Sequence, residues 1–526
     1  MAWAELRELT RGRRAELVTA ATNPRAAQEA LLREILARHQ ECAYGRRWQF
    51  SNIKSLADYR NAVPICDYEQ LAPYIEQMAN ATPNVLVSEA VSAFELTGGS
   101  SGGAKLIPLT ASGLAYMQRG LYTWLDDLLT HEAAVAQGRS YWSLSPALCE
   151  SKVTAGGIPI GLSNDAEYFG SAAGAILDLL VTPPVLALLG DIETWRYITL
   201  QCLLADETLA FVSIWSPTFW LELMKHAQIK RTVLIDGLRY GHWAVPVPNK
   251  LAHLLPAPAK NPARAALVDA ALAQTSPDWR ARWPKLAVIS CWTHASSEPW
   301  ATRLAAQFPN VRLQGKGLLA TEGMVSLPIL EVVDPVLALK SSVIEFEDAA
   351  GRVYACDELN SGSDYDILLT TSAGLYRYRL GDRVRVTGWW NAAPQLRLLG
   401  RAGIVSDLCG EKLNDAFVTQ CWTSISNLPA RLTPITLPHP HYRLWLDTEV
   451  NEASALATAL EQALRANPQY AYARDLGQLL PIVSYSISGL AARLQTLALA
   501  SGQRLGDAKP QFLGKIDDPD LNELAS

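Results

Sequence analysis

Three glycine-flanked runs hold the residue types best suited to chemistry. The first, at 96–105, combines four glycines, three hydroxyl side chains and a lysine. Glycines allow backbone N–H groups to converge on an anion, while hydroxyls and a lysine add donors and positive charge. This composition predicts a site for a triphosphate, and a flexible loop without a ligand is the alternative. The predicted phosphate-binding residues are Thr97, Gly98, Gly99, Ser100, Ser101, Gly102, Gly103 and Lys105.

The first run also bears on two other known motifs. A Walker-type loop is excluded because Ala104 stands where that motif requires a lysine. The glycines and Ser100 within 98–102 do match the nucleophile elbow of a serine hydrolase. Such an enzyme needs a later acid and histidine, and nothing marks His439 or His441 for that role. A hydrolase that uses Ser100 stays a remote alternative.

The second run, 315–323, follows a strand-like segment at 311–313 and contains Thr321 and Glu322. A hydroxyl suits a phosphate. A carboxylate suits Mg²⁺, which needs only one or two protein carboxylates when substrate phosphates supply the other oxygens. The run therefore predicts Thr321 as a phosphate contact and Glu322 as the magnesium ligand. The alternative is a helix start with favourable charge.

Aromatic and basic residues alternate in the third run, 374–382, as on a half-buried strand, and the run ends in Gly381-Asp382. An aspartate at a strand end can accept both hydroxyls of a ribose, so Asp382 is the predicted ribose ligand. The alternative is a ladder of exposed arginines with Asp382 in a turn. A Gly-Arg step ending at Arg401 follows.

The elements that must position these runs follow an α/β pattern. Residues 1 to about 80 are predicted to be helical, with leucines at helical spacing in 27–39 and Asp67 as the cap of a later helix. From about 85 to 400, short apolar runs alternate with helical stretches, which predicts substantial parallel sheet. The expected strands include 85–87, 286–289 and 367–369, and the expected helices include 111–129 and 217–226.

The pattern restarts beyond residue 403. Strands are expected at 404–406, 442–446 and 482–487, and helices from Asn414 and over 452–466. About 120 residues suit a small α+β domain. We therefore expect a large N-terminal domain over 1–401, which opens with a helical lead-in at 1–80, and a small C-terminal domain over 402–526.

Composition narrows the partners. The 526-residue chain is 49% apolar with a formal net charge of −6, so it offers no broad basic field for a nucleic acid or an anionic membrane. No stretch has the ~20 clean apolar residues that a bilayer requires, and the N-terminus lacks a secretory pattern. Eight cysteines without a Cys-x-x-Cys pair disfavour zinc and disulfide scaffolds. A reducing cytoplasm is the expected setting, and the oligomeric state is open.

The order of these runs resembles the adenylate-forming superfamily of acyl-CoA synthetases, peptide-synthetase adenylation domains and luciferases. Its motifs are a phosphate loop, a Thr-Glu pair, a Tyr-Arg-x-Gly-Asp run and a Gly-Arg step. A closer likeness, over nearly the whole chain, is to the Gretchen Hagen family of acyl acid amido synthetases and its bacterial relatives. Segments that carry this likeness include 43–46, 63–69, 73–76, 288–292, 344–346 and 467–470.

The resemblance implies a large α/β adenylate-forming domain with mixed parallel sheets, followed by a mobile α+β lid domain. It also implies an activity: ATP activates a carboxylic acid as its acyl-adenylate, and the acyl group passes to an amine or amino acid with release of AMP and pyrophosphate. ATP and Mg²⁺ are the implied cofactors. The alternatives are thioester formation with coenzyme A and a nucleotide-binding protein without turnover.

The resemblance extends the set of site residues. It adds Leu318, Leu319, Ala320 and Arg401 to the ATP-binding group, and it makes Lys105 catalytic together with a C-terminal lysine. Lys509 is favoured for that second role because it lies where relatives have Lys-x-Pro-Arg, although the arginine is missing. Lys515 is the alternative because Gly-Lys at 514–515 resembles the acyl-CoA synthetases.

Two positions depart from the superfamily pattern. Leu318 stands where an aromatic residue stacks on adenine, and Gly403 stands where the hinge aspartate is expected. The acyl pocket is less defined by the sequence. Among sixteen tryptophans, Trp215 and Trp292 are candidates to line it, with core packing as the alternative.

Overall fold

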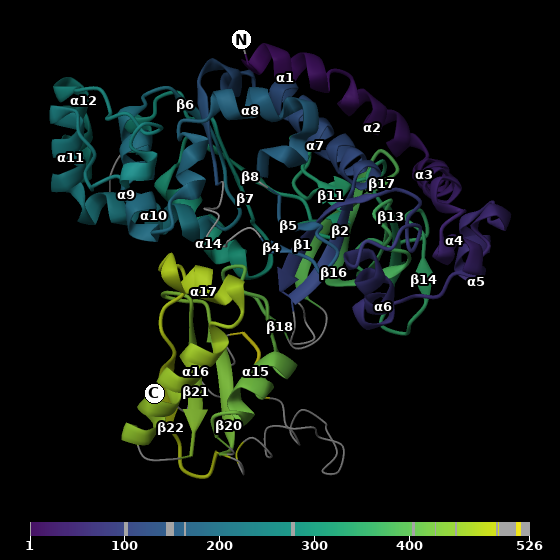
Figure 1. Cartoon of the computed structure of the whole chain (residues 1–526). Helices are drawn as coiled ribbons and strands as arrows, with labels where there is room; N and C mark the ends of the chain where they lie inside the picture. Colours follow the sequence, from purple (N-terminus) through teal and green to yellow (C-terminus); the bar gives the residue numbers. More distant parts are fainter. Residues whose placement is uncertain are drawn as a thin grey trace. The chain divides into compact units, whose positions relative to one another are not determined.

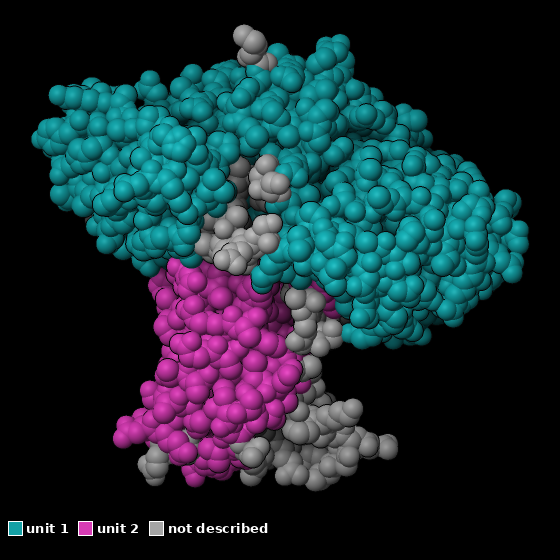
Figure 2. All heavy atoms as spheres, viewed as in Figure 1, with its two compact units in different colours: residues 1–96, 106–399 teal, residues 97–105, 400–526 magenta. Residues whose placement is uncertain are grey.

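The computed structural model describes residues 2–98, 104–143, 152–162, 165–274, 279–401, 405–426, 428–447, 450–490, 493 and 512–516. Contacts divide the chain into two compact units, coloured separately in Figure 2. Unit 1 comprises 1–96 and 106–399, and unit 2 comprises 97–105 and 400–526. Each unit is described by itself, and the expected domain boundary after residue 401 stays a prediction.

Helices open unit 1, as the leucine spacing predicts (Figure 1). They are α1 (Ala2–Thr10), α2 (Arg13–Thr22), α3 (Pro24–His39), α4 (Ala43–Arg47), α5 (Leu56–Ala62) and α6 (Tyr68–Ala79). Asp67 caps α6 as expected, because its carboxylate accepts the backbone N–H of Gln70 while the Gln70 side chain accepts that of Asp67. The cap and the apolar face together explain why α6 begins at Tyr68.

The strand expected at 85–87 is absent. These residues are buried, yet their carbonyl groups are used by other elements: Val85 accepts from the backbone of Tyr44, and Leu86 accepts from the Tyr376 hydroxyl. This apolar run is therefore a buried connecting segment and not a strand, because its backbone groups form hydrogen bonds outside any sheet.

Two strands flank the first glycine run. They are β1 (Val91–Gly98) and β2 (Ala104–Thr110), in a sheet of order β2-β1-β5-β4 with β4 (Lys152–Val153) and β5 (Pro159–Ile160). Helix α7 (Ala111–His131) starts directly after β2, because the Thr110 hydroxyl accepts the backbone N–H of Gly113 at 3.1 Å. The strand, the cap and the helix form one continuous segment.

A four-stranded sheet of order β3-β6-β7-β8 has parallel neighbours throughout. Its strands are β3 (Arg139–Trp142), β6 (Leu209–Ser213), β7 (Val288–Cys291) and β8 (Arg312–Gly315). Nearby helices are α8 (Ala173–Leu179), α9 (Ile192–Ala205), α10 (Pro217–Ile229), α11 (Arg231–Tyr240), α12 (Pro262–Leu272), α13 (Trp279–Arg282) and α14 (Glu298–Gln307). Figure 1 shows α9–α12 on one side of these strands and α7 on the other, which is the predicted α/β pattern.

A seven-stranded antiparallel sheet of order β11-β12-β17-β16-β15-β13-β14 completes unit 1. Its strands are β11 (Ser326–Leu327), β12 (Val336–Leu337), β13 (Val343–Glu347), β14 (Val353–Tyr354), β15 (Asp364–Thr370), β16 (Tyr378–Trp390) and β17 (Ala393–Arg401). A separate short hairpin joins β9 (Leu319–Ala320) to β10 (Gly323–Met324). The expected strand at 367–369 is confirmed within β15.

Unit 2 is α+β in its described part, as predicted. Its elements are β18 (Val405–Ser406), β19 (Leu413–Asn414), α15 (Asp415–Thr423), β20 (Ala430–Ile435), β21 (His441–Leu446), α16 (Val450–Leu464), α17 (Pro468–Asp475) and β22 (Val483–Ser486). Strands β20, β21 and β22 form one sheet. Apolar residues of this sheet and of α15 and α16 pack in a core of their own.

Candidate active site

Thr321 and Glu322 form the two-residue turn of the β9–β10 hairpin, so the helix-start alternative is wrong. Ala320 pairs with Gly323 across the turn. The base of the hairpin is tight: the backbone of Val325 donates to the Leu318 carbonyl at 2.9 Å. A turn of this kind holds both side chains in a fixed direction, which suits a ligand-binding pair.

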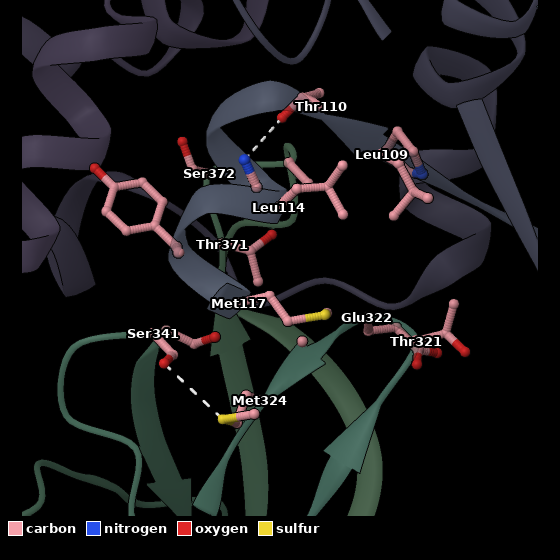
Figure 3. A pocket seen from close by; sticks show the side chains of 16 residues that line it. Leu109, Thr110, Leu114, Met117, Thr321, Glu322, Met324, Ser341, Thr371 and Ser372 are labelled. Carbon is pink, nitrogen blue, oxygen red and sulfur yellow. Dashed lines mark hydrogen bonds between the residues drawn. The ribbon is translucent and has the colours of Figure 1, made fainter. Parts of the chain in front are cut away.

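The hairpin borders a small cavity of about 20 Å³, close to the space that one water needs. Figure 3 shows its lining from α7, the hairpin and the loop after β15. Hydroxyl-bearing residues dominate the polar part of the lining: Thr110, Thr321, Ser341, Ser342, Thr371 and Ser372, together with Glu322. This cavity brings Thr321 and Glu322 next to the end of β2, the strand that also contains the predicted Lys105.

Glu322 is a buried carboxylate, 7% exposed, and within the described residues it has neither an ion pair nor a hydrogen bond. A carboxylate that has no partner in the described protein can bind a cation through its oxygens. The described chain holds no cluster of three or more His, Cys, Asp or Glu side chains suited to a metal. One carboxylate fits Mg²⁺ when phosphate oxygens supply other ligands. The residues present therefore fit the implied metal.

Helix α7 packs closely against this hairpin. A Cβ atom added at Gly120 would lie 2.1 Å from the Met324 sulfur and 2.6 Å from the Ser341 hydroxyl oxygen. Real Cβ atoms do not approach that closely. A larger residue at 120 would therefore force the Met324 and Ser341 side chains to shift, and glycine lets α7 pack against the strand that follows Glu322 without that change.

Asp382 lies inside β16, which corrects the expectation that it ends a strand. The register explains its orientation: Arg379 faces Leu368 and Arg383 faces Asp366, so β16 holds extra residues in a bulge. Gly381 has φ +83° within this bulge, a conformation that favours glycine. Asp382 is buried and is not among the residues that line the cavity.

Arg379 of the third run and two arginines that follow it on β16 form the ladder given as its alternative, although Asp382 lies in the strand and not in a turn. Arg379 pairs with Glu347, Arg383 with Asp366 and Arg385 with Asp364, each through two hydrogen bonds. Arg377 differs because it is buried. Its guanidinium contacts the Glu345 carboxylate at 2.9 Å and donates to the carbonyls of Arg60 and Val63. All four arginines therefore have structural partners.

The tryptophans proposed for the acyl pocket lie at the carboxyl edge of the parallel sheet. Trp215 comes shortly after β6 and Trp292 directly after β7, with ring centroids 5.9 Å apart. The Trp292 backbone donates to the Trp215 carbonyl at 2.8 Å. Ligands of parallel α/β sheets bind beyond this edge, so the position suits the proposed role.

Several predicted residues lie outside the described part of the chain: Gly99, Ser100, Ser101, Gly102, Gly103, Lys509 and the hinge position Gly403. Thr97 and Gly98 end β1, Lys105 is a buried residue of β2, Arg401 ends β17 and Lys515 is exposed. Leu318, Leu319 and Ala320 belong to the hairpin and its base but not to the cavity lining. The choice between Lys509 and Lys515 stays open.

Sequence reasoning missed a buried chain of hydrogen bonds beside the cavity. The backbone N–H of Ser88 donates to Nδ1 of His39, so Nε2 carries the proton and donates to the Ser372 hydroxyl at 3.1 Å. Ser372 contacts Ser112 at 2.6 Å, and Ser112 contacts Glu89. Burial lowers the pKa of His39 to about 4. Thr371 and Ser372, two hydroxyl residues directly after β15, could have indicated this chain of hydrogen bonds in the sequence.

Two solved structures share this fold. The chain is similar to a solved 2-hydroxyisobutyryl-CoA ligase in its thioester-forming state, with a TM-score of 0.52, 12% identity and coverage of 95% of this chain and 92% of the other. It is more similar to the GH3.15 acyl acid amido synthetase in complex with 2,4-DB, with a TM-score of 0.68, 20% identity and coverage of 97% and 95%.

The chain belongs to the GH3 family, since the GH3 N-terminal domain matches residues 13–313 and the GH3 central domain matches 338–401. One curated relative is the indole-3-acetic acid-amido synthetase GH3.15 of Arabidopsis thaliana, 25% identical over 74% of this chain and 70% of the relative. Another is the 4-substituted benzoates-glutamate ligase GH3.12 of the same plant, 24% identical over 75% and 72%. The resemblance read from the motifs is confirmed, and these relatives are amide-forming ligases.

Proposed function

We propose that this chain activates a carboxylic acid with ATP and passes the acyl group to an amine or amino acid. A carboxylate oxygen attacks the α-phosphorus of ATP, and pyrophosphate leaves. The amine nitrogen then attacks the acyl carbon, AMP leaves, and the nitrogen loses a proton. The observation that carries the proposal is the buried, unpaired Glu322 at the tip of a hydroxyl-lined hairpin, in a chain of the GH3 family.

The first step brings two anions together, so its catalysis depends on positive charge and aligned donors. In the proposal Glu322 would hold Mg²⁺, which would supply positive charge where the two anionic substrates meet. Thr321 donates to a phosphate. The run from Thr97 to Lys105 surrounds the phosphates, Asp382 holds the ribose, and Arg401 lies at the nucleotide.

The remaining roles concern the acid and the transfer step. Trp215 and Trp292 flank the apolar body of the acid, and Lys509 or Lys515 assists the chemistry from the mobile C-terminal domain. No helix in the described part of the chain is both long and apolar enough to span a bilayer. The seven cysteines described are free thiols, which suits the reducing cytoplasm that we infer.

Acid-dependent exchange of labelled pyrophosphate into ATP tests the first step. Wild type is expected to exchange with a panel that includes indole-3-acetate and 4-substituted benzoates. Glu322→Gln should lower exchange by at least about 100-fold, because lost charge stabilisation of several kcal/mol has that effect. Glu41→Gln, at an exposed glutamate paired with Arg46, is the control and should exchange normally.

Product analysis separates the remaining alternatives. Amides formed with amino acids support the proposal. If the only product is a thioester with coenzyme A, the second step is thioester formation and not amide formation. Ester cleavage without exchange, abolished by Ser100→Ala, would favour the hydrolase. Near-normal exchange by Glu322→Gln would remove Glu322 from the site.

A further inference from the structure

Lys316 is a cation without a counter-charge at the carboxyl edge of the parallel sheet. It follows β8 directly, and its backbone donates to the Cys291 carbonyl at 2.8 Å. Its Nζ atom donates to the Ser213 hydroxyl at 2.9 Å. Within the residues described, no carboxylate lies within ion-pair distance of this ammonium. Its charge is thus met only by a hydroxyl and aromatic rings.

Aromatic rings form two walls around this ammonium. Nζ lies 4.9 Å from the ring centroid of Trp124 on α7 and 5.0 Å from that of Trp215. Such cation–π contacts are worth up to about 2 kcal/mol when desolvated. They stabilise a cation but do not neutralise it.

Unsatisfied hydrogen-bond donors lie in the same part of the sheet. Ser213, Ser290 and Gln314 are register partners on β6, β7 and β8, so their side chains share one face. Gln314 accepts from the Trp124 indole through Oε1, but its Nε2 and the Ser290 hydroxyl are buried without a partner. Two unmet donors beside an uncompensated ammonium indicate a site for an anion.

Solvent reaches this edge of the sheet, and the ammonium there is charged at neutral pH. Trp215 is 38% exposed, and Lys316 is only partly buried. Burial lowers the pKa of Lys316 to about 8. The titratable group that faces it is Cys291 on β7, and burial raises the pKa of that thiol to about 12. At pH 7 the thiol is neutral and the ammonium is charged.

We propose that Lys316 binds the carboxylate of the acid substrate, with Trp215 beside the apolar body of that acid. The inference rests on the proposed function and deepens it. One ammonium between indole rings matches a ligand with one negative group on an apolar frame. A triphosphate carries several charges and would require several cations, whereas the described wall supplies one.

Lys316→Met tests this assignment because it removes the charge and keeps an apolar side chain of similar length. In pyrophosphate exchange the variant should raise the KM for the acid at least tenfold and leave the KM for ATP within about twofold of wild type. Lys225→Met, at an exposed lysine of α10 paired with Glu222, is the matched control. An unchanged KM for the acid in a folded variant, or a raised KM for ATP alone, overturns the assignment.

The pH dependence gives a second readout that a packing role would not produce. The carboxylate is ionised throughout, and Lys316 loses its proton as pH rises through about 8. The KM for the acid in wild type should therefore increase about tenfold per pH unit above pH 8. Lys316→Met should show a flat profile over that range. Parallel profiles for the two proteins contradict the inference.

Direct binding separates this inference from the proposed function. Quenching of tryptophan fluorescence by 4-substituted benzoate, and by the corresponding uncharged benzamide, measures affinity without ATP. Benzoate should bind wild type at least tenfold more tightly than Lys316→Met, while the benzamide should not distinguish them. If benzoate binding depends on Lys316 but no pyrophosphate exchange occurs, the role of Lys316 stands and the proposed ligase function is wrong. If pyrophosphate exchange occurs but wild type and Lys316→Met bind benzoate equally well, the role of Lys316 is wrong and the proposed function stands. The role of Lys316 is also wrong if wild type does not bind benzoate.

Discussion

The arginines of the antiparallel sheet and Lys316 of the parallel sheet are cations in opposite situations. Arg377, directly before β16, and Glu345 of β13 are 6% and 2% exposed and share a hydrogen-bonded ion pair. On the parallel sheet, Lys316 has indole rings, one hydroxyl and no carboxylate among the described residues. Both cations lie in motif runs that the sequence singled out.

The difference separates architecture from ligand binding. A buried cation whose donors are all used holds strands and loops in place, and it has nothing left for a substrate. A partly exposed cation beside unmet donors is incomplete until an anion arrives. Positive charge in a motif is therefore a weak guide to function until its partners are known.

Loss of the buried pair should give the largest effect on stability. Glu345→Gln leaves the Arg377 guanidinium buried without its counter-charge and also breaks the ion pair of Glu345 with Arg60, so we expect the free energy of unfolding to fall by about 3–5 kcal/mol. Denaturant unfolding of unit 1 measures this. Glu347→Gln, on the adjacent exposed pair with Arg379, is the control. Equal small losses in both variants would show that burial does not distinguish these pairs.

His39 tests a third situation, a titratable group kept neutral. Its pKa is lowered by burial from 6.5 to about 4, so the unfolded chain binds the extra proton between these values. Stability should be full above pH 6.5 and fall by about 3 kcal/mol as pH decreases to 4. His39→Gln should lack this component when unfolding is compared at pH 7 and pH 4. The same slope in both proteins would contradict it.

The exposed ladder should give the smallest effect. Arg383→Met removes a pair with Asp366 in which both side chains are partly exposed, and such pairs are worth less than about 1 kcal/mol. The loss should shrink further in high salt because exposed charges are screened. Unfolding at two ionic strengths checks this, and a salt-independent loss of several kcal/mol would place this pair with Arg377 instead.

Local patterns predicted much of the fold. The cap at Asp67 and the helix from Asn414 follow from side chains that bond their own neighbours, and such signals are visible in sequence. The strand predicted at 85–87 is wrong because the hydrogen bonds of this segment involve Tyr44 and Tyr376, which are distant in sequence. Hydrophobicity alone cannot tell a buried strand from buried connecting chain.

The site was predictable in its residue types more than in its geometry. Thr321 and Glu322 were predicted because the pair is polar and flanked by glycine, and both residues line one cavity; their roles stay predictions. Asp382 was misplaced because a bulge depends on the register of β15 and β16, which no local pattern reveals. Lys316 went unnoticed since an unpaired charge is defined by what is absent around it.

The glycine at 120 has a consequence for redesign of this enzyme. Helix α7 and the hairpin that bears Glu322 meet there, and a methyl group added at 120 would push the side chains of Met324 and Ser341 aside. Because Met324 follows Glu322 by two residues, a larger residue at 120 would reach the proposed site through the packing of the hairpin, without touching any substrate.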